Sequence, residues 1–164
     1  MTTTDIQLRL ATNADAGAIM ALISAVFAEY GMIWDAAVEV PDLFDIETNY
    51  SSARGAFFVS EIGGQIVGTV GVTFEGASHA EVHRLYVSPT HRRLGLGRLL
   101  MNHVLMWARE RDLSEMTAWS DTRFDKAHNL YRSLGFTQME GERPMVGDVN
   151  NSAEYQFVLT LASM

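Results

Sequence analysis

The sequence contains no cysteine among its 164 residues. Disulfide bonds, thiolate metal sites and cysteine nucleophiles are therefore excluded together. Long apolar runs are also missing, because stretches such as residues 17–27 are interrupted or shorter than the roughly 20 residues that a membrane-spanning helix needs. The chain does not open with a basic segment followed by an apolar one, so it shows no signal peptide. We expect a cytoplasmic protein that does not enter a membrane.

Positive charge is scarce. The chain has 12 Lys and Arg against 20 Asp and Glu, a formal net charge of -8 at pH 7. This balance argues against nucleic acid as a partner, because phosphates require a basic surface. The acidic residues Glu29, Asp35, Glu39, Asp42, Asp45 and Glu47 crowd one stretch, whereas Arg84, His91, Arg92, Arg93 and Arg98 crowd another. The basic cluster indicates either a bound anion or a solvated surface that is merely uneven.

The pattern of apolar residues predicts one domain over residues 1–164. Hydrophobic residues make up 48% of the chain, which is enough for the core of a globular protein. Periods of two predict strands at 6–10, 56–62, 65–74, 79–87, 116–119, 136–139 and 154–161. Helical spacing predicts helices after Thr12-Asn13, over 95–111 and over 125–134, with a short helix after Pro41. The order β-α-α-β-β-β-α-β-α-β-β indicates an α/β fold, one mixed sheet with helices on its faces.

The segment Arg92-Arg93-Leu94-Gly95-Leu96-Gly97 joins the strand that ends at Val87 to a predicted amphipathic helix. Glycines allow the backbone to turn sharply and to approach a ligand closely. The unpaired N–H groups of the first helical turn and the positive end of the helix dipole then bind phosphate or pyrophosphate. The P-loop pattern and the third glycine of G-x-G-x-x-G are both absent. A lone G-x-G is also explained by a tight turn from strand to helix that binds no ligand.

Two motifs carry a family resemblance. Arg92-x-x-Gly95-x-Gly97, placed after the strand that contains His83-Arg84-Leu85-Tyr86-Val87, resembles the acetyl-CoA pyrophosphate loop of the GCN5-related N-acetyltransferases, the GNAT family. Residues 127–136 match the family's second motif, an alanine followed by Leu-Tyr and then Gly-Phe. The resemblance implies a mostly antiparallel central sheet flanked by helices. It also implies an N-acetyltransferase that moves an acetyl group from acetyl-CoA by direct attack of a primary amine, on a small molecule or a peptide.

The resemblance implies the cofactor contacts as well. The pyrophosphate would lie on backbone N–H groups of Arg93, Leu94, Gly95, Leu96, Gly97 and Arg98, with Arg92 adding charge. The backbone of Leu85, Tyr86 and Val87 would pair with the pantetheine arm, and the Val87 N–H would face the thioester carbonyl. No metal is implied. One position departs from the family: Phe124 stands where relatives often have a cofactor-binding asparagine, so Asp121, Thr122 or Asn129 replaces that contact or it is missing.

The resemblance places the catalytic groups on two elements. Tyr131 matches the family's general acid, which returns a proton to the departing CoA thiolate. The amine must first lose a proton, and Glu81 and His83 lie on the same face of the strand before the loop. His83 titrates near neutrality without help, whereas Glu81 would need burial. Either residue or a water chain could be the base.

The acceptor side is less informative. The resemblance places the acceptor pocket at about residues 30–50 and 143–155, where the acidic stretch with Tyr30, Trp34 and Tyr50 would suit a cationic or polyamine-like acceptor. A solvated acidic loop explains the same residues. Two other functions are compatible with the loop, namely a non-catalytic acyl-CoA sensor or interaction domain and a nucleotide-binding module. Homodimers are common in the family, and no interface is visible in the sequence.

Overall fold

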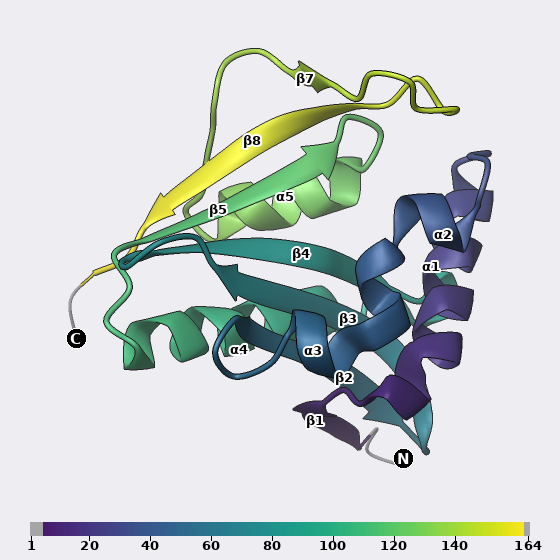
Figure 1. Cartoon of the computed structure of the whole chain (residues 1–164), viewed down its shortest axis with the longest axis horizontal. Coiled ribbons are helices and arrows are strands. Elements are labelled where there is room, and N and C mark those ends of the chain that lie inside the picture. Colours follow the sequence, from purple (N-terminus) through teal and green to yellow (C-terminus); the bar gives the residue numbers. More distant parts are fainter. Residues whose placement is uncertain (1–4, 163–164) are drawn as a thin grey trace.

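Eight strands form one open sheet in the computed structural model, which describes residues 5–162 (Figure 1). The strands are β1 (Ile6–Leu10), β2 (Gly55–Ile62), β3 (Gln65–Phe74), β4 (His79–Val87), β5 (Glu115–Asp121), β6 (Thr137–Gln138), β7 (Arg143–Pro144) and β8 (Ala153–Thr160). They are ordered β1-β2-β3-β4-β5-β8-β6, and β7 pairs with β8. All paired neighbours are antiparallel except β4 and β5. The predicted mixed, mostly antiparallel sheet is confirmed.

Helices cover both faces of this sheet (Figure 1). They are α1 (Ala16–Glu29), α2 (Ala36–Glu39), α3 (Ile46–Asn49), α4 (Leu96–Glu110) and α5 (Asp125–Ser133), with 3-10 turns η1 (Asn13–Asp15), η2 (Pro41–Asp45) and η3 (Pro89–His91). Side chains of β2 alternate between the two cores: Phe57 and Val59 pack with α1 and η2, whereas Phe58 packs with α4 and α5. This alternation follows from the two-residue period of a strand, and it explains why β2 is apolar on both faces.

The hairpin predicted at Gly63-Gly64 joins β2 to β3 with φ values of 58° and 78°. Both values lie in the left-handed region that a two-residue hairpin turn requires and that glycine adopts without strain. Two predictions differ from the structure. The expected strand at 136–139 shrinks to the two residues of β6, and β7 was not predicted. Leu99, expected on the buried face of α4, is 37% exposed because that face is centred on Leu100 and Val104 instead.

The two central strands part in the middle of the sheet. Pairing between β4 and β5 covers only residues 79–82 and 115–118. Beyond that point β4 carries a bulge against β3, where the register shifts between Thr69 and Gly71 and Arg84 takes a φ of 54°. The Thr69 hydroxyl donates to the Arg84 carbonyl oxygen at 2.8 Å and holds the bulge. Residues 85–87 therefore have no partner strand on the β5 side within the described chain.

A partly buried ion pair fixes this bulge to the helical face. The Asp42 carboxylate of η2 accepts hydrogen bonds from Arg84 Nη2 at 2.6 Å and from the Tyr50 hydroxyl at 2.6 Å. Burial alone would raise the pKa of Asp42, but the bonds from Arg84 and Tyr50 outweigh it and bring the pKa below its usual value. The pair thus stabilises the fold above the unfolded-state pKa of Asp42, and this contribution is lost as pH falls through the lower folded-state pKa.

We predict that Asp42→Asn lowers the free energy of unfolding by about 2 kcal/mol at pH 7, because it leaves the partly buried Arg84 without its counter-ion. Urea denaturation measures this loss, with Asp5→Asn, an exposed aspartate, as the control. Below pH 4 the difference between wild type and Asp42→Asn should shrink. A difference that stays constant down to pH 3 would contradict the ion-pair explanation.

Candidate active site

The loop between η3 and α4 presents a row of free backbone donors. Gly95 precedes the first turn of α4 with a φ of 75°, and Arg93 has a φ of 67°, so the chain reverses sharply there. The six N–H groups of Arg93–Arg98 donate no hydrogen bond to any other described residue. They lie at the positive end of the dipole of the 15-residue α4. Such a concave set of amides binds an anion through the backbone.

The arginines of this loop contribute unequally. Arg92 forms an ion pair with Glu29 of α1, and Lys126 lies 3.9 Å from the same carboxylate. Arg92 lowers the pKa of Glu29, which shows that its charge is already partly compensated within the protein. Arg98 donates to the Ser133 hydroxyl at 2.7 Å. Arg93, itself a loop residue, is exposed and lines the cavity that adjoins the loop.

A cavity of about 430 Å³ adjoins the loop. Its lining includes the end of β4, the loop and the start of α5, with Arg92, Arg93, Gly95, Leu96, Gly97 and Arg98 from the loop. Leu85, Tyr86 and Val87 line it from the unpaired end of β4. Two expected cofactor contacts lie outside its lining: Leu94 is 46% exposed, and exposed Asn129 accepts a hydrogen bond from Arg132. Phe124, the departure from the family pattern, is part of the wall.

The backbone of β4 directs a donor into this gap. The Ser88 N–H donates to the Val67 carbonyl at 2.9 Å, and the next pair in the register is Val87 with Gly68. In an antiparallel ladder, hydrogen-bonded and non-hydrogen-bonded pairs alternate. The Val87 N–H therefore points away from β3, toward the side where β5 has moved off. A group lying in the gap would meet this donor.

A second cavity, of about 850 Å³, lies on the other side of the parted strands. Four residues line both cavities: Leu85, Tyr86, Phe124 and Ala127. The two cavities thus adjoin where β4 leaves β5. The second cavity contains all three catalytic candidates from the sequence, Glu81, His83 and Tyr131. The free amides of the loop therefore border the smaller cavity, and these three side chains line the larger cavity that adjoins it.

Tyr131 is 3% exposed and packs against Phe136 and Phe157. No hydrogen bond joins its hydroxyl to another described residue. Burial, and to a smaller extent Tyr86, raises the pKa of Tyr131, so the phenol is protonated at neutral pH. The sequence assigned Tyr86 a backbone role only, but its side chain lines both cavities and burial raises its pKa to about 12. No signal in the sequence pointed to this, because Leu85, Tyr86 and Val87 form an apolar run that core packing explains equally well.

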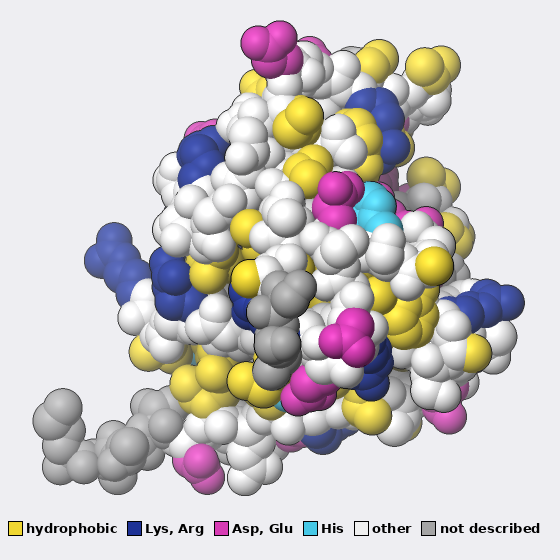
Figure 2. All heavy atoms as spheres, turned by 90° about the vertical axis from the view of Figure 1, so that its left-hand side faces the viewer, with side chains coloured by type: hydrophobic (Ala, Val, Ile, Leu, Met, Phe, Trp, Pro, Cys, Tyr) yellow, Lys and Arg dark blue, Asp and Glu magenta, His cyan; other side chains and the backbone are white. Residues whose placement is uncertain are grey.

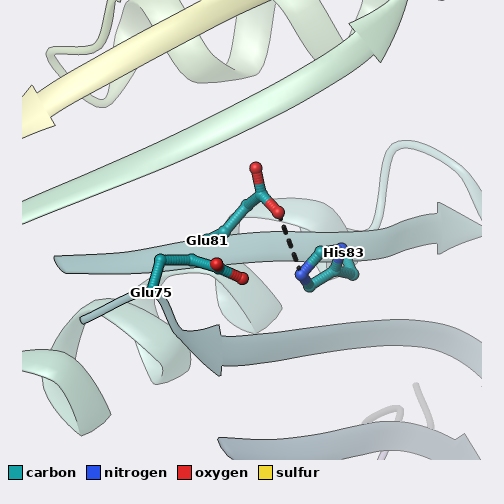
Figure 3. A group of neighbouring side chains, drawn as sticks. All are labelled: Glu75, Glu81 and His83. Carbon is teal, nitrogen blue, oxygen red and sulfur yellow. Dashed lines mark ion pairs between the residues drawn. The ribbon is translucent and has the colours of Figure 1, made fainter.

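Glu81 and His83, both on β4, lie close to Glu75, which follows the end of β3 (Figure 3). His83 Nε2 lies 3.3 Å from Glu81 Oε2 and 2.8 Å from the Thr73 hydroxyl, which itself donates to Glu75 at 2.9 Å. Since that hydroxyl has one proton and gives it to Glu75, it must accept from His83. The His83 proton is therefore on Nε2, and Nδ1 keeps a free lone pair. One imidazole and two carboxylates could also ligate a metal, but these atoms already bond within the group.

The same burial acts in opposite directions on the two candidate bases. Burial, followed by the positive charge of Arg84, lowers the pKa of His83. Burial, followed by repulsion from Glu75, raises the pKa of Glu81. His83 is therefore neutral at pH 7 and able to accept a proton on Nδ1.

The acceptor-side expectations are partly met. Glu39 from the first region and Arg143, Asp148 and Glu154 from the second line the larger cavity. Three aromatic residues do not: Tyr30 lines the smaller cavity instead, Trp34 packs against Phe27, and Tyr50 is buried in the core with its hydroxyl on Asp42. Figure 2 shows another face of the molecule, where charged side chains of both signs are scattered among apolar ones. The carboxylates inside the larger cavity are thus a local feature.

Within residues 5–162 no helix is both long and apolar enough to cross a membrane. The sequence model of the Acetyltransferase (GNAT) family matches residues 22–136. N-acetyltransferase 8 of Rattus norvegicus is 38% identical over 107 residues, which are 62% of this chain and 48% of that protein. N-acetyltransferase 8F1 of the same species is 34% identical over the same share of each chain. The chain spans about half the length of the curated relatives it matches.

Solved structures share the fold. An acetyltransferase of the GNAT family from Staphylococcus aureus Mu50 superposes with a TM-score of 0.84 at 21% identity, covering 96% of this chain and 100% of that one. The protein yncA from Salmonella typhimurium, solved with its cofactor acetyl-CoA, has a TM-score of 0.76 at 24% identity and covers 98% of this chain and 96% of its own. These likenesses confirm the predicted fold across the described chain.

We predict that Gly95→Val raises the dissociation constant of coenzyme A about 10-fold or more. No atom lies within 4 Å of a Cβ at Gly95, so the effect comes from the left-handed φ, which costs a β-branched residue about 1–2 kcal/mol and turns the loop amides away. Calorimetric titration measures the constant. Gly141→Val is the matched control, with a φ of 82°, equal free space and a position far along the chain from the loop. Equal losses in both variants would show that the loop geometry does not matter.

Proposed function

The chain belongs to the acetyltransferase (GNAT) family, and from that premise we propose that it transfers an acetyl group from acetyl-CoA to a primary amine. The observation that carries this proposal is the set of features along two adjoining cavities: free amides and an unpaired strand end at the smaller one, and a buried phenol and a neutral histidine in the lining of the larger one. An anion-binding loop alone would also fit a nucleotide. The unpaired end of β4 fits an extended amide-bearing arm such as pantetheine, which pairs with it as an added strand.

The donor would lie across both cavities. Its pyrophosphate would accept hydrogen bonds from the N–H groups of Arg93–Arg98, and its pantetheine would run beside Leu85–Val87. The thioester carbonyl would then meet the Val87 N–H, which points into the gap. That donor stabilises the oxyanion of a tetrahedral intermediate, a contribution of about 3 kcal/mol where one such donor has been removed in other enzymes.

The acceptor would enter from the larger cavity. An ammonium loses a proton to Nδ1 of His83, and the free amine attacks the thioester carbon. A C–N bond forms, the carbonyl electrons move to oxygen, and the intermediate collapses as the C–S bond breaks. Tyr131 gives its proton to the departing CoA thiolate, and the proton that the acylated nitrogen still has to lose restores the Tyr131 phenol. The first proton passes from His83 to solvent. The products are an N-acetyl amide and free CoA thiol, with one net proton released.

The direct test is release of free thiol from acetyl-CoA over a panel of small amines and peptides, with mass spectrometry of the acetylated product. Turnover on any acceptor supports the proposal. Tight CoA binding without turnover on every acceptor would instead support a non-catalytic acyl-CoA sensor, and protection by ATP that CoA cannot match would support a nucleotide-binding module.

We predict that Tyr131→Phe lowers kcat about 10²-fold, a typical loss for a general acid, with little change in the KM for acetyl-CoA. Because the hydroxyl bonds to no described residue, the thermal midpoint of the variant should match that of wild type. Tyr155→Phe, on β8 and outside both cavities, is the control. An unchanged kcat in Tyr131→Phe, with a large loss in Tyr86→Phe, would move the acid role to Tyr86.

We also predict that kcat/KM rises with pH and that the midpoint of this rise lies below pH 6.5. The base must be deprotonated to act, and burial lowers the pKa of His83 from its ordinary value. His83→Gln should abolish this rise and lower kcat/KM about 10²-fold. Thr73→Val removes the acceptor of the His83 proton and should change the position of the rise. A pH profile that survives in His83→Gln but disappears in Glu81→Gln would assign the base to Glu81.

A further inference from the structure

The larger cavity has more negative charge than its own positive groups can balance. Five carboxylates line it, those of Glu39, Glu81, Asp121, Asp148 and Glu154. Two arginines line it, and each is already held by a carboxylate: Arg84 by Asp42, and Arg143 by Glu154 at 2.7 Å. Asp121 has its own counter-ion in Arg123 at 3.1 Å. Neither Glu39 nor Asp148 forms an ion pair with a described residue.

Glu39 has a further peculiarity. Its Oε1 atom is buried and has no hydrogen-bond partner. A buried acceptor without a partner costs about 1–3 kcal/mol, and native proteins leave few of them. Burial, followed by repulsion from Asp148, raises the pKa of Glu39. A cation placed beside this carboxylate would relieve the repulsion from Asp148.

The segments that carry Glu39 and Asp148 are held together. Asn150 accepts a hydrogen bond from the Ile33 N–H at 2.7 Å and donates one to the Ile33 carbonyl at 3.0 Å. Asp148 accepts from the backbone N–H groups of Asn150 and Ser152, both at 3.0 Å, so its carboxylate is fixed. The two acidic side chains therefore belong to one built wall of the cavity.

The rest of that wall is apolar. Met32 and Val38 line the cavity from the N-terminal side, and Met145 and Val146 line it from the β7–β8 side. Val38 and Val146 are 63% and 97% exposed, so they form an apolar rim. Apolar walls that end at carboxylates fit a methylene chain with an ammonium group at its end.

We propose that the acceptor is an aliphatic amine that carries a second ammonium group, with one amine at His83 and the other at Glu39 and Asp148. This assignment rests on the proposed acetyl transfer, which supplies the reacting amine. Glu39 determines specificity in it and takes no part in the chemistry. A diamine enters as a dication and leaves as a monocation after acetylation, so the product interacts less strongly with this acidic wall than the substrate does.

The test compares butane-1,4-diamine with butylamine, which has the same stem and a single charge. In wild type, kcat/KM should be about 10-fold or more higher for the diamine, the value of one charge-assisted hydrogen bond. Glu39→Gln should remove most of this preference through KM while kcat/KM for butylamine stays the same. Glu110→Gln, at the exposed end of α4, is the control. Equal kcat/KM for both amines in wild type, or equal losses for both in Glu39→Gln, would overturn the proposal.

A binding measurement separates this proposal from the acetyl transfer itself. Saturation of the CoA-bound protein with each amine is followed by the rise in thermal midpoint. If no amine is acetylated but the diamine stabilises the wild type more than butylamine does, and Glu39→Gln abolishes the difference, the transfer reaction fails while the dication site stands. If amines are acetylated without any advantage of the diamine in rate or in binding, the dication site fails while the transfer reaction stands.

Discussion

The parting of β4 from β5 is the constraint on which the rest of the site depends. Parallel pairing ends at Val82 and Ala118, and beyond the bulge at Arg84 the residues of β4 stay paired with β3 but no longer pair with β5. A central strand with free donors in an apolar interior would be costly, because each buried N–H needs an acceptor. The cost is tolerable only where a ligand or water fills the gap. The gap between β4 and β5 is thus a feature of the folded core, and both cavities adjoin it.

The bulge is in turn held by contacts that come from distant parts of the chain. A non-glycine residue with a φ of 54° is disfavoured, and Arg84 adopts this conformation because its carbonyl accepts from Thr69 while its guanidinium reaches Asp42. Asp42 lies on the helical segment that also carries Glu39. The ion pair therefore couples the backbone of β4 to the wall of the larger cavity, and Asp42 partly compensates the positive charge of Arg84 there.

The sequence predicted those features of the structure that depend on residues close together in the chain. Strands β1, β3 and β4 have the predicted bounds because their alternation and their glycine turns act over a few residues. The turn into α4 was also predicted, since a glycine at the start of an amphipathic helix is a short-range signal. The pairing of Asp42 with Tyr50 and Arg84 was not, and Tyr50 was expected at the acceptor instead of in the core. Such contacts depend on how the helical segments pack against the sheet. The spacing of residues along the sequence does not predict this packing.

Burial gives the acid and the base their complementary states. Removing water disfavours whichever form of a group is charged, so the pKa of Tyr131 rises while that of His83 falls. Both groups are therefore neutral at pH 7, the phenol with its proton and the imidazole without one on Nδ1. A thiol with an ordinary pKa near 8.5 would be a poor match for so weak an acid. The same dry site destabilises the departing thiolate, however, and raises its affinity for a proton. In the proposed reaction, burial thus acts on the proton donor, the proton acceptor and the leaving group alike, and neither proposed catalytic side chain is charged.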